Sequence, residues 1–273
     1  MIKRNISKLI KSKAFISRPL ITLFRLLKLL FYDIFKIRKI VNIKHNNINF
    51  KFYYNPGLKL HSGGRGLYLF REKFEDLLEF GHKFINRNDN CIDGGANQGI
   101  YSLSFSSVVG ENGKVVFVEP FNYCHQIIKE NMLLNNFNNI ILEKKVLFEK
   151  SKEIKYIDYS YGVGSASITK NFGKKNILET ETITIDDISK KYNLNINFIK
   201  LDVEGAELHA LNGSKITIEK YNPILCIECR DIELYSKIQN FLEKFKYKAW
   251  VFKNNDLIGF KNFTPKSNIF FLK

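Results

Sequence analysis

The chain has 273 residues, of which 45% are hydrophobic and 26% are charged. This length and balance are typical of one globular domain with a short extension, and they exclude a disordered chain or a membrane-spanning protein. The net charge is +16, and residues 1–45 contain twelve Lys or Arg but one acid, Asp33. Residues 46–273 contain 31 basic and 26 acidic residues and are therefore only mildly basic. Because the positive charge is concentrated at one end, nucleic acid is not expected as the main partner.

Residues 1–45 are predicted to form a basic, amphipathic N-terminal helical extension. From Pro19 to Ile40 the sequence is apolar but interrupted by cations every few residues, at Arg25, Lys28, Lys36 and Lys39. No uncharged run approaches the ~20 residues that cross a bilayer. Two interpretations stay open: contact of residues 19–40 with a membrane surface, through Leu and Phe side chains and anionic headgroups, or docking on the domain or on a partner subunit.

Residues 46–88 are predicted to form a lead-in to the main domain. Ile48 to Tyr54 alternates as a strand does, Gly57 to Gly66 is a Gly-rich turn region, and Glu72 to Phe84 has the apolar spacing of a helix.

Residues 89–273 alternate between predicted strands and helices. The strands are expected at 91–93, 114–118, 140–147, 182–185, 198–202, 224–228, 249–252 and 269–272, and the helices at 100–109, 124–135, 186–192, 204–211 and 232–245. This alternation predicts a mostly parallel sheet with helices on both faces, closed by an antiparallel pair at the C-terminus. Such sheets bind ligands beyond the carboxyl ends of their strands.

The four cysteines, Cys91, Cys124, Cys226 and Cys229, are too few for a disulfide scaffold. Cys226 and Cys229 lie three apart on one predicted strand and therefore point to opposite faces, which disfavours a zinc or redox pair. We expect four reduced thiols in a cytoplasmic protein.

A Gly-rich loop, Asp93-Gly-Gly-Ala-Asn-Gln-Gly99, connects a predicted strand to a predicted helix. Its glycines allow the backbone to turn sharply and to approach a ligand. Ala96 breaks the Gly-x-Gly-x-x-Gly pattern of dinucleotide sites, and an acid stands where a phosphate would approach. The loop therefore favours a cationic sulfonium nucleoside over a pyrophosphate.

Glu119 ends the next strand and is followed by Pro120. A carboxylate at this place can accept both ribose hydroxyl hydrogens. The residues expected to bind the nucleoside cofactor are Asp93, Gly94, Gly95, Ala96, Asn97, Gly99, Glu119 and Pro120.

These motifs resemble the FkbM family of S-adenosylmethionine-dependent methyltransferases. The matching stretches are Ile92-Asp-Gly-Gly-Ala-Asn-Gln-Gly99, Val118-Glu-Pro120, Ile183-Thr-Ile-Asp-Asp187, Phe198-Ile-Lys-Leu-Asp-Val-Glu-Gly-Ala-Glu207, Leu211-Asn-Gly213 and Pro223-Ile-Leu-Cys-Ile-Glu228. Gly94 departs from the Val or Ile that is more frequent in the family. The resemblance implies a Rossmann-like class I methyltransferase fold with a seven-stranded sheet, S-adenosylmethionine as the cofactor, and methyl transfer to oxygen, often on a sugar or natural product.

Transfer to a hydroxyl needs a base or a metal ion at the acceptor oxygen. Asp202, at a strand end, is the first candidate base, with Lys200 on the same face of the strand and Glu204 after it. A cap at the start of the next helix is the alternative role of Glu204 and Glu207. Asp202 and Glu228, at neighbouring strand ends, could also hold a divalent cation such as Mg²⁺.

The sequence thus predicts an O-methyltransferase that acts on a glycan or small molecule, in the cytoplasm and peripherally at the inner face of the membrane. Two alternatives stay open: a non-catalytic, membrane-associated nucleoside-binding protein and a nucleic-acid methyltransferase. The loop from Tyr161 to Ser167 is a candidate substrate-facing segment because it is Gly-rich and irregular. The acceptor and the oligomeric state do not follow from these residues.

Overall fold

A computed structural model describes residues 10, 12–56, 63–74, 77–78, 81–160, 166–169, 176–253, 256–260 and 267–273. Within them, no helix combines the length and the hydropathy that crossing a bilayer requires.

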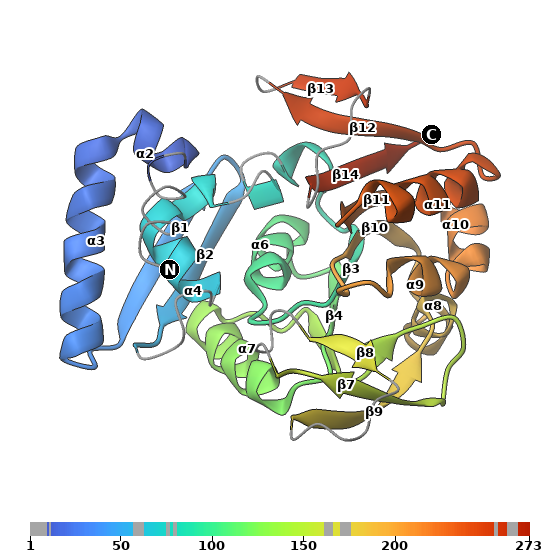
Figure 1. The fold of residues 1–273 in the computed structure, drawn as a ribbon, viewed down its shortest axis with the longest axis horizontal. Helices are drawn as coiled ribbons and strands as arrows, with labels where there is room; N and C mark the ends of the chain where they lie inside the picture. The colour runs from blue at the N-terminus through green and yellow to red at the C-terminus, as the bar shows by residue number, and fades with distance from the viewer. Residues whose placement is uncertain are drawn as a thin grey trace.

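The main sheet has eight strands among the described residues, in the order β13-β12-β14-β11-β10-β3-β4-β5 (Figure 1). Their bounds are β3 (Asn90–Gly94), β4 (Lys114–Val118), β5 (Ile140–Glu143), β10 (Ile196–Leu201), β11 (Ile224–Cys229), β12 (Lys248–Lys253), β13 (Asp256–Gly259) and β14 (Ser267–Leu272). Strands β5, β4, β3, β10 and β11 are parallel, and β14 runs antiparallel to both β11 and β12. The predicted mostly parallel sheet with an antiparallel C-terminal strand is confirmed, except that β13 adds an eighth strand at the edge.

Helices cover both faces of the sheet (Figure 1). One face carries α6 (Ile100–Val109) and α7 (Asn122–Asn135), and the other carries α8 (Ile185–Tyr192), α9 (Glu207–Asn212), α10 (Lys215–Tyr221) and α11 (Ile232–Glu243). The central strands are mostly apolar because both of their faces are covered. The chain order reverses at β3, whose neighbours are β4 and β10, and parallel sheets bind ligands at such a point.

The N-terminal part packs against α6 and α7 as a further layer. It contains α2 (Lys13–Ser17), α3 (Pro19–Ile34), the antiparallel hairpin of β1 (Lys39–His45) and β2 (Ile48–Tyr54), and α4 (Gly63–Phe70). Alternate residues of β2, beginning with Ile48 and Phe50, are buried in the same core as Phe105 of α6. The Asn131 and Asn135 side chains of α7 accept hydrogen bonds from backbone N–H groups of β2 at 2.8 and 2.7 Å. The predicted boundary between residues 45 and 46 therefore falls in the turn of a hairpin.

Three predicted elements in this part differ from the structure. The helix predicted to reach Ile40 ends at Ile34, and Lys39 begins β1. Gly63 to Gly66 begins α4, where a turn was predicted, while residues 57–62 lie outside the described part. Of the helix predicted over Glu72 to Phe84, residues 77–78 are helical, short 3₁₀ turns occupy Arg71–Lys73 and Gly81–Lys83 at its ends, and residues 75–76 and 79–80 are not described.

A second sheet, in the order β6-β9-β7-β8, lies beside the carboxyl ends of the main strands (Figure 1). It contains β6 (Val146–Leu147), β7 (Ile154–Asp158), β8 (Ser167–Thr169) and β9 (Ile177–Ile183). The single strand predicted over 140–147 is wrong, because the chain leaves the main sheet after Glu143 and joins β9 through β6.

Candidate active site

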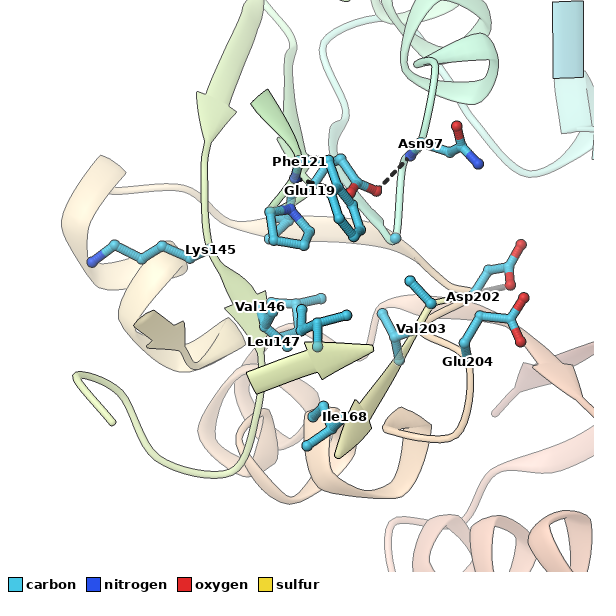
Figure 2. A pocket seen from close by; sticks show the side chains of 15 residues that line it. Asn97, Glu119, Phe121, Lys145, Val146, Leu147, Ile168, Asp202, Val203 and Glu204 are labelled. Carbon is cyan, nitrogen blue, oxygen red and sulfur yellow. Dashed lines mark hydrogen bonds between the residues drawn. The ribbon is translucent and has the colours of Figure 1, made fainter. Parts of the chain in front are cut away.

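The carboxyl ends of β3, β4 and β10 surround an open cleft of about 670 Å³ (Figure 2). Its polar walls come from the loops that follow these strands and include Asn97, Glu119, Asp202 and Glu204. The second sheet closes the remaining side with apolar residues, among them Leu147, Ile157 and Ile168.

The Gly-rich loop supports this cleft through its backbone. Gly95 has a φ of +72°, and a Cβ atom there would lie 1.8 Å from the carbonyl oxygen of Asp202. Only glycine therefore lets the β3 loop pack against the β10 loop. Gly99, with a φ of +79°, starts α6 and would meet Ile128 if it carried a side chain. Of the predicted loop residues, Gly95 and Asn97 line the cleft.

Asp93 lies behind the loop and is completely buried, although the sequence suggested a side chain available to the ligand. The Ser102 hydroxyl donates a 2.6 Å hydrogen bond to Oδ2, while Oδ1 is buried without a hydrogen-bond partner. Burial raises the pKa of this carboxyl, and the charge of Lys200 on the neighbouring strand opposes that rise. Asp93 therefore lies behind the cleft and is not one of the residues that line it.

Glu119 is the acid at the end of β4, and it is only 5% exposed. Its carboxylate accepts backbone hydrogen bonds from Asn97 (2.9 Å) and Phe121 (3.2 Å), which join the β3 and β4 loops (Figure 2). Burial raises the pKa of Glu119 to about 7, and these two donors limit the rise. The side chain therefore lines the cleft as a fixed acceptor, and Pro120 lines the wall beside it.

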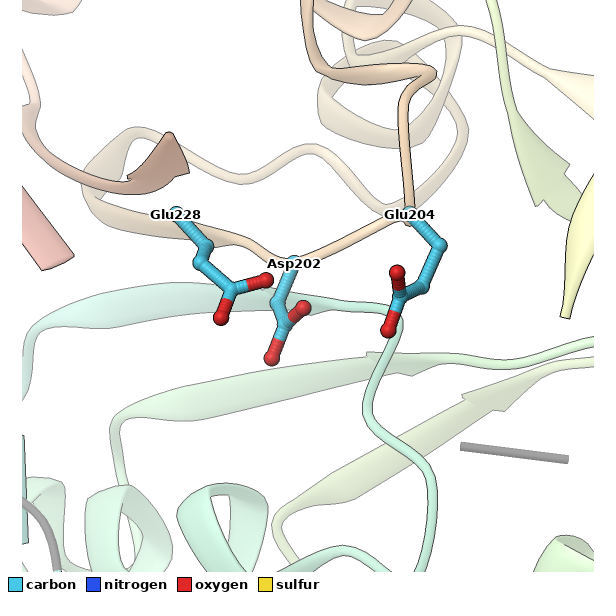
Figure 3. Close-up of side chains that lie close together, drawn as sticks. All are labelled: Asp202, Glu204 and Glu228. Carbon is cyan, nitrogen blue, oxygen red and sulfur yellow. The ribbon is translucent and has the colours of Figure 1, made fainter. Parts of the chain in front are cut away.

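Three carboxylates gather at the ends of β10 and β11. One oxygen each of Asp202, Glu204 and Glu228 lies within 4.8 Å of the others, and Asp202 stands between the two glutamates (Figure 3). Burial raises the pKa of Glu228 to about 8, and the nearby charge of Asp202 contributes. The buried ammonium group of Lys200 lies 3.2 Å from Asp202 Oδ2. The structure thus brings together all four residues predicted for catalysis or metal binding.

Glu204 and Glu207 have different roles. Glu204 has a φ of +50° and lies in the turn before α9, so the helix predicted to start there begins three residues later. Glu207 is completely buried, and its carboxylate accepts hydrogen bonds from the backbone N–H groups of Val203 and Gly205 at 3.0 to 3.1 Å. Glu207 stabilises the turn before α9, while Glu204 lines the cleft. Neither residue caps the helix as predicted, because Ala206 occupies the N-cap without a side-chain hydrogen bond.

A larger groove adjoins the cleft, and the two share Ile168 and Glu204. Its walls include Tyr156, His209 and Arg230, from parts of the chain that lie far apart in the sequence. The His209 ring stacks on Phe148 at 4.4 Å between centroids. Most of this groove was not predicted from the sequence, because one wall belongs to the unpredicted second sheet. Of the candidate substrate loop, Ala166 lines the cleft and Ser167 lines the groove, while residues 161–165 lie outside the described part.

The buried histidine of α7 and the four cysteines lie outside the acid cluster. His125 is buried, and its Nε2 lies 2.7 Å from the carbonyl oxygen of Glu119. The four cysteines are buried, and none of them forms a disulfide.

Comparisons with known proteins agree with this arrangement. The sequence profile of the methyltransferase FkbM domain matches residues 93–249. No curated protein matches the chain. The crystal structure of methyltransferase FkbM from Methylobacillus flagellatus KT is similar at 17% identity and a TM-score of 0.49, over 78% of this chain and 55% of that one. The present chain thus spans little more than half the length of that protein.

Two further solved structures are similar at lower TM-scores. They are an S-adenosylmethionine-dependent O-methyltransferase from Thermotoga maritima (13% identity, TM-score 0.39, 69% of this chain and 60% of that one) and an S-adenosylmethionine-dependent methyltransferase from Aquifex aeolicus (13%, 0.35, 69% and 82%). The profile match covers more than half of the sequence and contains Asp93, Glu119, Asp202 and Glu228. The chain belongs to the FkbM methyltransferase domain family.

Proposed function

We propose that this protein transfers a methyl group from S-adenosylmethionine to a hydroxyl oxygen of a sugar, a glycan or a small natural product. The observation that carries the proposal is the position of Glu119 in the same cleft as the carboxylates of Asp202 and Glu204. A cleft with acids on both polar walls complements a positively charged ligand and repels a diphosphate.

The residues present suit the donor. The Glu119 carboxylate, oriented by two backbone N–H groups, would accept the ribose hydroxyls. The apolar walls formed by Phe121, Ile157 and Ile168 would contact the adenine ring. When bound, S-adenosylmethionine supplies a methyl group that its sulfonium makes electrophilic. The task left to the protein is to align the acceptor oxygen with that carbon and to accept the hydroxyl proton.

The acceptor would approach through the adjoining groove, because Glu204 and Ile168 lie where the two cavities meet. Asp202 is the proposed base. Lys200 fixes its carboxylate from behind at 3.2 Å, and Glu204 and Glu228 flank it. Because its pKa is raised to about 8, Glu228 largely keeps its proton near neutral pH, which leaves Asp202 as the proton acceptor of the cluster.

A divalent cation at Asp202 and Glu228 stays a prediction, now extended to Glu204. Three carboxylate oxygens that lie this close offer the hard oxygen ligands that Mg²⁺ binds. The Lys200 ammonium already places one positive charge beside Asp202, which favours the arrangement without metal. Dialysis against a chelator distinguishes a metal-free site from a cation site. Unchanged turnover supports Asp202 as a metal-free base, and a loss of turnover that only Mg²⁺ restores supports the cation.

The test is methyl transfer from labelled donor to a lysate separated into glycan, lipid, small-molecule and nucleic-acid pools. We expect label in the glycan or small-molecule pool, and at least about a hundredfold less with Asp202→Asn, since a positioned base contributes 10²–10⁴-fold. Glu219→Gln, a change at an exposed acid on α10 that lines neither the cleft nor the groove, is the matched control. Label in nucleic acid alone would contradict the acceptor class. Donor binding without label in any pool would favour the non-catalytic alternative.

A further inference from the structure

The outer face of α3 is unlike the rest of the surface. Of eighteen large apolar side chains that are exposed among the described residues, twelve lie between residues 10 and 40. Six of them recur every three or four residues along one face of α3 and are 47% to 81% exposed: Leu20, Leu23, Phe24, Leu27, Phe31 and Ile34. Exposed apolar residues elsewhere, such as Leu133 and Ile216, are scattered. A continuous apolar patch of this kind marks an interaction surface.

The inner face of α3 carries the polar contacts. The buried Thr22 hydroxyl donates to the Ala14 carbonyl at 3.1 Å, and Arg25 donates to the Leu69 carbonyl at 3.3 Å. Asp33 forms an ion pair with Arg65. The same face buries Leu29, which is 2% exposed and belongs to the core. Together these contacts fix which side of the helix faces the domain. The apolar side chains therefore cannot be buried against the domain by rotation of the helix.

The charges beside this face are positive. Asp33 is the only acid among residues 10–50, and it faces the protein. Lys28 and Lys36 are exposed, and the Lys28 ammonium lies 4.4 Å from the centre of the Phe24 ring. Lysines placed in this way can rest their aliphatic stems on the apolar surface while the ammonium groups reach anionic headgroups.

We propose that α3 is the membrane-docking surface of this protein: it lies flat in the interface of an anionic phospholipid bilayer, with Leu20, Phe24, Leu27 and Phe31 among the acyl chains. The apolar area supplies the insertion, and the lysines supply the preference for anionic lipid. A second copy fits less well, because pairing this face with itself would bring the same lysines together without an acid to neutralise them. The inference does not depend on the methyl-transfer proposal.

The test is sedimentation of the full chain with vesicles of equal parts phosphatidylglycerol and phosphatidylcholine, compared with vesicles of phosphatidylcholine alone. We expect binding to the mixed vesicles that weakens with added salt. Leu27→Asp combined with Phe31→Asp should lower that binding at least about tenfold, because a charge in the apolar face opposes insertion. Lys28→Glu should lower it at least about fivefold, since loss of one cation near an anionic surface contributes this factor and the new carboxylate is repelled. Leu27, Lys28 and Phe31 are all exposed, so these variants are expected to fold as the parent does.

The matched controls are Ile216→Asp, an exposed apolar residue on α10, and Lys215→Glu beside it. Both should bind the mixed vesicles as the parent does. Absence of binding by the parent, or equal losses in the α3 and α10 variants, would overturn the proposal. A dimer that Leu27→Asp dissociates, found by light scattering without lipid, would also overturn it in favour of contact between copies.

Discussion

At the scale of single residues, Glu228 shows the electrostatic cost of the acid cluster. Its pKa is raised to about 8 by burial and by Asp202, so the folded protein holds this proton more tightly than the unfolded chain does. As pH rises from the ordinary Glu value toward 8, the unfolded chain releases its proton first, and the free energy of unfolding falls. The cluster thus lowers stability at the site where function requires closely spaced carboxylates.

Replacing this carboxyl by an amide should remove the cost. We expect Glu228→Gln to raise the Tm by about 2–4 °C at a pH of about 9, where roughly 1 kcal/mol of repulsion is relieved. At a pH of about 5 the two proteins should melt together, because the parent is then protonated at Glu228. Thermal unfolding at both pH values makes the comparison, with exposed Glu219→Gln as the control. A variant less stable than the parent at high pH would show that the charge on Glu228 is not repelled.

At the scale of elements, the turn at Gly95 determines how the β3 loop meets the β10 loop. Gly95→Ala would place a methyl group against the Asp202 carbonyl and force a left-handed backbone on alanine. We expect a loss of about 3 kcal/mol or more, a Tm lower by roughly 6 °C or more, and at least tenfold weaker donor binding. Gly259→Ala is the matched control, since nothing lies within 4 Å of a Cβ atom there. Equal melting of both variants would refute the tight contact.

The central strands could be predicted from the sequence because both of their faces are buried. β4 and β10 are mostly apolar runs followed by Glu119 and Asp202, so the pattern located the strand ends and the acids together. The second sheet could not be found in the same way. In β9 (Ile177–Ile183), Glu and Thr occupy the middle of the strand, and its partner β6 has only two residues. Neither strand therefore has an apolar pattern long enough to predict a strand.

The turn at Glu204 and the orientation of α3 depend on contacts distant in the sequence. The apolar spacing predicted α9 to start at Glu204, but the buried Glu207 carboxylate holds the preceding turn and delays the helix. For α3, the spacing of its apolar residues predicted an amphipathic helix. Which side faced the domain was decided by partners such as Leu69 and Arg65, which lie more than 30 residues away.

At the scale of the whole molecule, the N-terminal hairpin and the α/β domain share one core. β2 contributes Ile48, Phe50 and Phe52 to the cluster that also contains Phe105 of α6, and α7 side chains bind its free backbone edge. α3 is attached to this hairpin layer, on the far side of α6 and α7 from the main sheet (Figure 1). The proposed membrane surface and the cleft are therefore parts of one folded body.

Titration calorimetry tests most directly the claim that the acidic cleft binds a cationic adenosyl ligand. We expect heat with S-adenosylmethionine and S-adenosylhomocysteine and none with a nicotinamide dinucleotide. Glu119→Gln should weaken binding at least about tenfold, since hydrogen bonds to a charged group contribute about 1.5–3 kcal/mol. Glu143→Gln, a buried acid at the end of β5 outside the cleft, should stay within about twofold of the parent. Tight uptake of the dinucleotide, with no heat from either adenosyl compound, would contradict the proposed site.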